Sequence, residues 1–89
     1  MSDTKPNTIT VLDFSKQGIT HLPDLTEYTE LEELHCCYTF IESLPPILPA
    51  KLKTLSCSKN FLTYLPAQLP ASLKILKCQN NEITHFENL

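Results

Sequence analysis

The chain has 89 residues, of which 42% are hydrophobic, and its formal net charge is −3, so it can form one small domain but not two. It contains no apolar run approaching about 18 residues, so no transmembrane helix is predicted. Its single glycine excludes a glycine-rich phosphate-binding loop, and a pI near 5.5 argues against a dedicated nucleic-acid-binding domain.

The first eight residues of the chain are polar and lack the apolar stretch of a signal peptide. They also lie outside the internal repeat that occupies the rest of the chain. We therefore expect residues 1–8 to form a short disordered arm and residues 9–89 to form one domain.

Residues 9–89 carry an internal repeat in which apolar residues recur in five columns. Neighbouring copies are 21 residues apart, as from Leu34 to Leu55, except for a step of 22 residues from Leu12 to Leu34. The columns are Ile9, Leu31, Leu52 and Leu73; Leu12, Leu34, Leu55 and Leu76; Phe14, Cys36, Cys57 and Cys78; Ile19, Ile41, Leu62 and Ile83; and Leu22, Leu44, Leu65 and Phe86. The repeat units are therefore 9–30, 31–51, 52–72 and 73–89.

The alternation of apolar residues in L-x-x-L-x-C predicts one strand per unit with one buried face. Neighbouring strands of this kind pair in parallel, and about 15 residues connect them. The Leu-Pro steps in these connections exclude a regular α-helix, so an extended or 3₁₀ return path is expected. Residues 24–33 contain neither Pro nor Gly, and one helical turn is expected there.

The full unit reads L-x-x-L-x-C-x-x-N-x-L-x-x-L-P-x-x-L-P-x-x and is most complete in residues 52–72. It resembles the leucine-rich repeat family, in the short form found in secreted bacterial effectors, over about 80 of the 89 residues. The resemblance implies an α/β-type solenoid dominated by β structure. In this right-handed leucine-rich-repeat stack, about four short parallel strands face an extended or 3₁₀ convex side.

The asparagine column of the repeat is filled only in the last two units, by Asn60 and Asn81. In the family this side chain binds backbone groups of the turn that leaves the strand. Gln17 and Thr39 replace it only in part, so looser turns are expected in the first two units. Gly18 follows Gln17 and is expected to relieve the first turn with a positive φ.

Three of the four cysteines, Cys36, Cys57 and Cys78, share an inward column and are predicted to be buried free thiols. Free thiols favour a reducing compartment, either the cytoplasm or, by the effector-like resemblance, the interior of a host cell. Cys37 points outward and could pair with His35 as a nucleophile, but no oxyanion hole or third group is recognisable. The chain is therefore predicted not to be an enzyme. No metal-ligand spacing is found, and no cofactor is predicted.

The outward residues of the strands are predicted to form a concave face of the kind that repeat stacks use for binding. Residues 1–45 contain eight acids and two lysines, a balance of −6, whereas residues 46–89 contain two acids and five lysines, a balance of +3. The face should therefore change from acidic to basic along the stack. Tyr38 is the best anchor candidate, because exposed Tyr is enriched at interfaces. The predicted partner-binding residues are Val11, Asp13, Glu32, Glu33, His35, Tyr38, Lys53, Ser56, Lys59, Lys74, Ile75 and Lys77.

Two functions follow from this pattern. The first is a protein–protein interaction module that binds a partner protein on its concave face, without catalysis, nucleic acid or membrane. If the effector-like resemblance holds, that partner is a host protein. The alternative is a structural subunit that assembles with its own copies through uncapped ends, where Leu73, Leu76, Ile83 and Phe86 are predicted to face an open side. Phe40, Phe61 and Tyr64 are expected to pack on the turn side.

Overall fold

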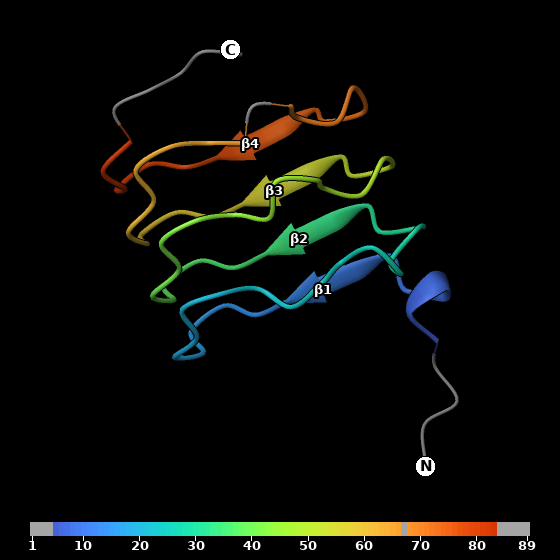
Figure 1. Ribbon diagram of the computed structural model, residues 1–89, viewed down its shortest axis with the longest axis horizontal. Coiled ribbons are helices and arrows are strands. Elements are labelled where there is room, and N and C mark those ends of the chain that lie inside the picture. The colour runs from blue at the N-terminus through green and yellow to red at the C-terminus, as the bar shows by residue number, and fades with distance from the viewer. Residues whose placement is uncertain (1–4, 67, 84–89) are drawn as a thin grey trace.

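The computed structural model describes residues 5–66 and 68–83. Four short parallel strands form one sheet in the order β1-β2-β3-β4 (Figure 1). The strands are β1 (Val11–Asp13), β2 (Glu33–His35), β3 (Thr54–Ser56) and β4 (Ile75–Lys77). The prediction of about four short parallel strands is confirmed.

The strands pair at the register of the sequence repeat. Leu12 lies opposite Leu34, Leu34 opposite Leu55, and Leu55 opposite Leu76. Backbone hydrogen bonds continue past the strands, because the Cys36 N–H donates to the Ser56 carbonyl at 2.8 Å. Each repeat unit therefore adds one strand to the sheet, and the residues of one column become neighbours in space.

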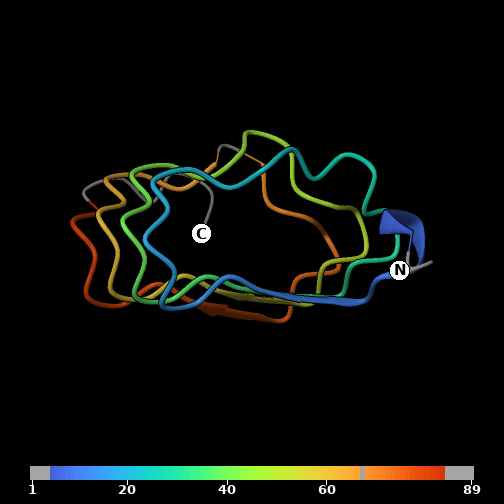
Figure 2. The same cartoon turned by 90° about the horizontal axis from the view of Figure 1, so that it is seen from below.

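The connections return opposite the sheet as irregular segments and turns (Figure 2). No α-helix occurs within residues 5–66 and 68–83, so the helical turn expected at residues 24–33 is wrong. Asp24 Oδ1 instead accepts a hydrogen bond from the Thr26 N–H at 2.9 Å. Such a side-chain turn competes with helix formation, and an isolated turn follows in which the Tyr28 N–H donates to the Leu25 carbonyl.

The segment predicted as a disordered arm contains a 3₁₀ helix, η1 (Pro6–Thr8). Pro6 occupies its first position, where a proline has no N–H to lose. The Thr8 N–H and hydroxyl both donate to the Lys5 carbonyl, at 2.9 and 2.8 Å. Residues 1–4 of the predicted arm lie outside the described residues.

The hydrophobic core lies between the sheet and the return segments and is complete in the two middle units. Its fully buried side chains are Leu31, Leu34, Cys36, Ile41, Leu52, Leu55, Cys57 and Leu62. The corresponding residues of the first and last units, such as Leu12 and Leu76, are only partly buried. Each terminal layer has a neighbouring layer on one side only, and this leaves it partly exposed.

Each strand is followed, three residues later, by a residue in the left-handed region. These residues are Lys16, Tyr38, Lys59 and Asn80, with φ between 59° and 64°. They recur at the repeat spacing, so the sharp turn after the strand is a property of the unit. Only Asn among them tolerates this conformation readily. The positive φ expected at Gly18 is wrong, because the turn is made two residues earlier.

Asparagine amides tie neighbouring units together inside these turns. Asn60 is 5% exposed, and its Nδ2 donates to the carbonyls of Cys36, at 2.8 Å, and Cys57, at 3.1 Å. Its Oδ1 accepts a hydrogen bond from the Thr39 N–H at 2.9 Å. Thr39 is itself buried and donates from its hydroxyl to Asn60 Oδ1 and to the Cys36 carbonyl. The second turn is therefore well bonded, contrary to the expectation that Thr would loosen it.

Candidate functional site

The outer face of the sheet, called the strand face below, brings most of the predicted binding residues together. In each strand the central Leu points into the core, so its two neighbours point outward. One row across the strands is Val11, Glu33, Thr54 and Ile75, and the other is Asp13, His35, Ser56 and Lys77. Val11 and Ile75 are about half exposed and lie on the two edge strands.

Charge is segregated along the strand face. Asp13 on β1 and Glu33 on β2 are exposed acids, whereas Lys77 on β4 and Lys74 just before it are exposed bases. No ion pair involving Lys74 or Lys77 is formed within the part of the chain that the structure describes. The face therefore has an acidic end at β1 and β2 and a basic end at β4.

Asp13 is held as an anion by the turn that follows its strand. Its Oδ1 accepts a hydrogen bond from the Ser15 N–H at 2.9 Å. Hydrogen bonds from the backbone and side chain of Ser15 hold the pKa of Asp13 below its ordinary value of 3.8, because they favour the ionised form. A full negative charge is therefore present at the β1 edge at neutral pH.

The remaining charges of the face form partly exposed pairs. His35 Nε2 lies 3.1 Å from Glu33 Oε1, on the same strand and the same face. Just before the strands, Lys53 Nζ lies 3.6 Å from Glu32 Oε1. Exposed pairs of this kind contribute little stability, roughly 0–1 kcal/mol, so a partner can exchange them for contacts of its own.

Tyr38 and Lys59 form a preordered contact beside the strands. Tyr38 is 52% exposed, and Lys59 Nζ lies 5.0 Å from the centroid of its ring. A cation over an aromatic face contributes roughly 0.5–1 kcal/mol at an exposed site. Lys59 therefore occupies one face of the ring, and about half of the Tyr38 side chain stays accessible.

Ser56 was predicted to contact a partner, but it is 5% exposed, so this prediction is wrong. It lies in register between His35 and Lys77, whose longer side chains flank it. Ser58, in the same unit, is also buried, and its Oγ has no hydrogen-bond partner in the described part of the chain. Strand alternation predicts the direction of a side chain but not its accessibility.

The four cysteines are free thiols. Burial raises the pKa of Cys36 to about 12 and also raises the pKa of Cys57. Cys78 is partly exposed, and burial raises its pKa as well. The prediction of buried free thiols is confirmed for Cys36 and Cys57. Both stay protonated at neutral pH and are poor nucleophiles.

Cys37 is partly buried, and its N–H donates to Ser15 Oγ at 3.1 Å. Within residues 5–66 and 68–83, no hydrogen bond joins its thiol to His35. In the same residues, no group of three His, Cys, Asp or Glu side chains is placed to hold a metal ion. The described chain also has no helix of the length and hydrophobicity needed to cross a membrane.

Sequence reasoning missed an aromatic surface beyond the turns. Phe40, Phe61 and Tyr64 were expected to pack on the turn side, but each is about half exposed. The rings of Phe40 and Phe61 stack with their centroids 6.1 Å apart. The 21-residue step between these two residues was the available signal, because it makes them neighbours in the stack.

Comparison of the chain with family models, with curated proteins and with solved structures gave no match. Its function is therefore inferred from its own residues.

Proposed function

We propose that this chain is a right-handed leucine-rich-repeat solenoid of the short, effector-like type, and that its concave strand face binds a partner protein. Three features support the repeat assignment. The strands pair at the repeat register, a left-handed residue recurs after each strand, and Asn60 and Asn81 bind backbone carbonyls in the turns.

The segregated charge of the strand face is the observation that supports binding. Acids cluster on β1 and β2 and unpaired lysines on β4, and such a field orients an approaching partner of complementary polarity. Val11, Ile75 and Tyr38 supply exposed apolar and aromatic area on the same side. The fitting partner carries a basic segment opposite β1 and β2 and an acidic segment opposite β4.

No catalytic step, nucleic acid, membrane or cofactor belongs to this proposal. The free thiols of Cys36, Cys37, Cys57 and Cys78 favour a reducing compartment, either the cytoplasm or the interior of a host cell. In the second case the partner is a host protein.

A charge exchange on the strand face tests the proposal. The double variant Glu33→Lys with Lys77→Glu keeps the net charge and inverts the field. The matched control is Glu27→Lys with Lys5→Glu, since both residues are exposed and lie outside the strands. Proteins captured from the native lysate are identified by mass spectrometry, and each one retained is titrated calorimetrically against the three proteins.

We expect the strand-face variant to weaken binding by about tenfold or more, because charges of like sign then face each other, and the control to bind normally. Equal affinity of the variant and the wild type, with unchanged circular dichroism, would refute binding at this face.

Self-assembly through the terminal layers is a second candidate, and the incomplete burial of Leu12 and Leu76 favours it. It predicts a mass that rises with concentration in sedimentation equilibrium and falls to the monomer on Ile83→Glu, which places a charge in the last layer. Phe86, the other residue predicted to face the open side, lies outside the described residues. A monomer at all concentrations would exclude this candidate.

A further inference from the structure

An exposed aromatic surface lies on the chain after the turns, apart from the strand face. Phe40 and Phe61 are 54% and 48% exposed, and their rings are nearly parallel, at 11°. The backbone holds them one unit apart, because the Phe40 N–H donates to the Ile19 carbonyl and the Phe61 N–H to the Ile41 carbonyl. This position is therefore as regular as the sheet, and it presents aromatic area to solvent.

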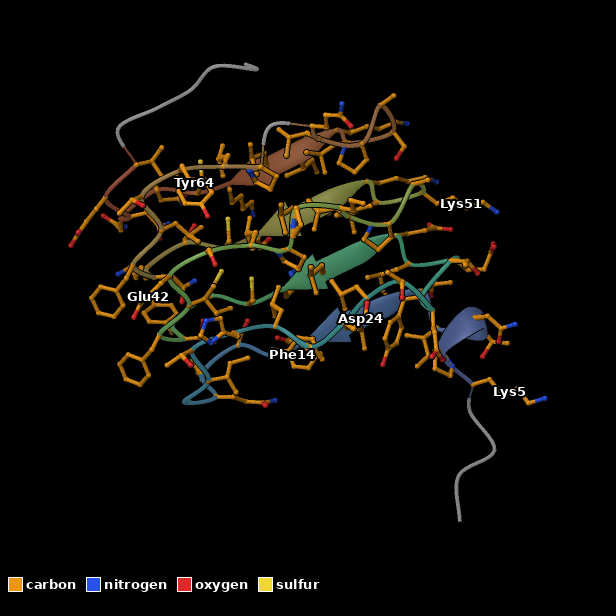
Figure 3. All side chains as sticks on the ribbon, in the orientation of Figure 1. Lys5, Phe14, Asp24, Glu42, Lys51 and Tyr64 are labelled. Atoms are coloured by element: carbon orange, nitrogen blue, oxygen red, sulfur yellow. The ribbon has the colours of Figure 1, made fainter. Side chains whose placement is uncertain are left out.

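An open groove of about 520 Å³ adjoins the Phe61 ring. It is lined by Glu42, Phe61, Thr63, Tyr64 and Glu82. Figure 3 shows Glu42 and Tyr64 on the same side of the molecule, well away from Lys51. The lining therefore combines two aromatic rings with two carboxylates, and it includes no basic side chain.

The carboxylates of this groove are free to accept a cation. Both Glu42 and Glu82 are exposed, and neither forms an ion pair with a described residue. An aromatic face attracts a cation, and a carboxylate accepts two hydrogen bonds from a guanidinium. A guanidinium is planar and weakly hydrated, so it combines stacking with bidentate pairing better than an ammonium does.

We propose that this groove binds an arginine side chain presented by a partner polypeptide, with the guanidinium stacked on Phe61 or Tyr64 and paired with Glu42 or Glu82. The groove is separate from the strand face, so this site operates whether or not the strand face binds a protein. A purely apolar occupant, such as the same surface of a second copy, would leave both carboxylates without a partner.

The test uses N-acetyl-arginine methylamide as the probe, titrated to high millimolar concentration into the ¹⁵N-labelled full chain. The matched probe is the citrulline analogue, which has nearly the same shape but no charge. We expect saturable amide shifts centred on residues 61–64 and 82 with the arginine probe, and binding at least several-fold weaker with citrulline.

Variants assign the contributions. Glu42→Gln and Glu82→Gln should each weaken arginine binding roughly twofold to fivefold, as expected for an exposed ion pair. Tyr64→Leu should weaken it by a similar factor through loss of the aromatic face. Glu27→Gln removes the same charge from an exposed position outside the groove and should leave the affinity unchanged.

Three results would overturn the proposal. The first is the absence of localised shifts. The second is equal binding of arginine and citrulline, which would indicate an apolar contact. The third is shifts centred on Asp13 and Glu33, which would assign the cation to the strand face. Self-association through the stacked phenyl rings would appear as concentration-dependent shifts of the same amides before any probe is added, and it would also contradict an arginine site.

Discussion

Replacement of Asn60 by Ala tests whether the asparagine amides hold the repeat units together. The amide is almost fully buried, and its Oδ1 is the acceptor for the N–H of Thr39, which is 3% exposed. Its Nδ2 donates to the carbonyls of Cys36, Cys57 and Ser58. Alanine leaves the Thr39 N–H without this acceptor and out of reach of bulk water.

The magnitude follows from counting these groups. One buried donor left unsatisfied costs roughly 1–3 kcal/mol, and each ordinary hydrogen bond lost costs roughly 1 kcal/mol more. The hydroxyl of Thr39 still donates to the Cys36 carbonyl, so that carbonyl keeps one partner. We expect Asn60→Ala to lower the free energy of unfolding by about 3 kcal/mol.

Asn81 provides the matched comparison, because it makes the same type of contact in a more exposed layer. Its Oδ1 accepts from the Leu62 N–H at 3.0 Å, and its Nδ2 donates to the Cys57 carbonyl at 2.9 Å. These bonds are only partly buried, so water replaces the amide in Asn81→Ala, and the expected loss is about 1 kcal/mol.

Urea unfolding followed by circular dichroism measures both variants, and equal slopes against urea would confirm that the unfolding transition is comparable. Equal losses for Asn60→Ala and Asn81→Ala would refute the assignment of the difference to burial. A loss well below 1 kcal/mol for Asn60→Ala would show that the interunit amide is dispensable.

Three further predictions concern the core, the turns and the thiols. Leu55→Ala, in a fully buried layer, should lower the free energy of unfolding by about 3 kcal/mol, and Leu76→Ala, in the partly exposed last layer, by about half as much; equal losses in urea would contradict the graded burial. Lys16→Asn should raise that free energy by about 0.5 kcal/mol, because Asn tolerates the φ of 64°, whereas Lys16→Val should lower it by about 1 kcal/mol; thermal unfolding checks the signs, and a stabilising Val would contradict the left-handed turn. In timed alkylation read by mass spectrometry, Cys37 should react first and Cys36 and Cys57 only after unfolding, so early modification of Cys36 would show that its layer opens.

The sheet and its register could be read from the sequence. Side chains in a parallel sheet pair with equivalent positions of the next strand, so the steps of 22, 21 and 21 residues directly predict that Leu12, Leu34, Leu55 and Leu76 share a column. The same spacing predicts which strands carry acids and which carry lysines. Burial of Cys36 and Cys57 also followed from the column, because they alternate with outward residues.

Details that depend on neighbours in space could not be read in this way. Ser56 was predicted to be accessible because alternation turns it outward, but it is covered because it is short and flanked by the longer His35 and Lys77. The helical turn expected at residues 24–33 was wrong because the Asp24 carboxylate binds the Thr26 N–H. A local hydrogen bond of this kind competes with a weak helix propensity.

The sequence by itself thus determined the order, direction and register of the strands, since these depend only on the period of the repeat. The tertiary structure decided where the chain makes its left-handed turns and which aromatic rings stay exposed. Lys16, Tyr38 and Lys59 carry no turn signal of their own, and their positive φ is imposed by hydrogen bonds to the next unit, such as that from the Tyr38 N–H to the Ser58 carbonyl. The groove beside Phe61 likewise exists only once two units are stacked, because it combines Glu42 of one unit with Tyr64 of the next.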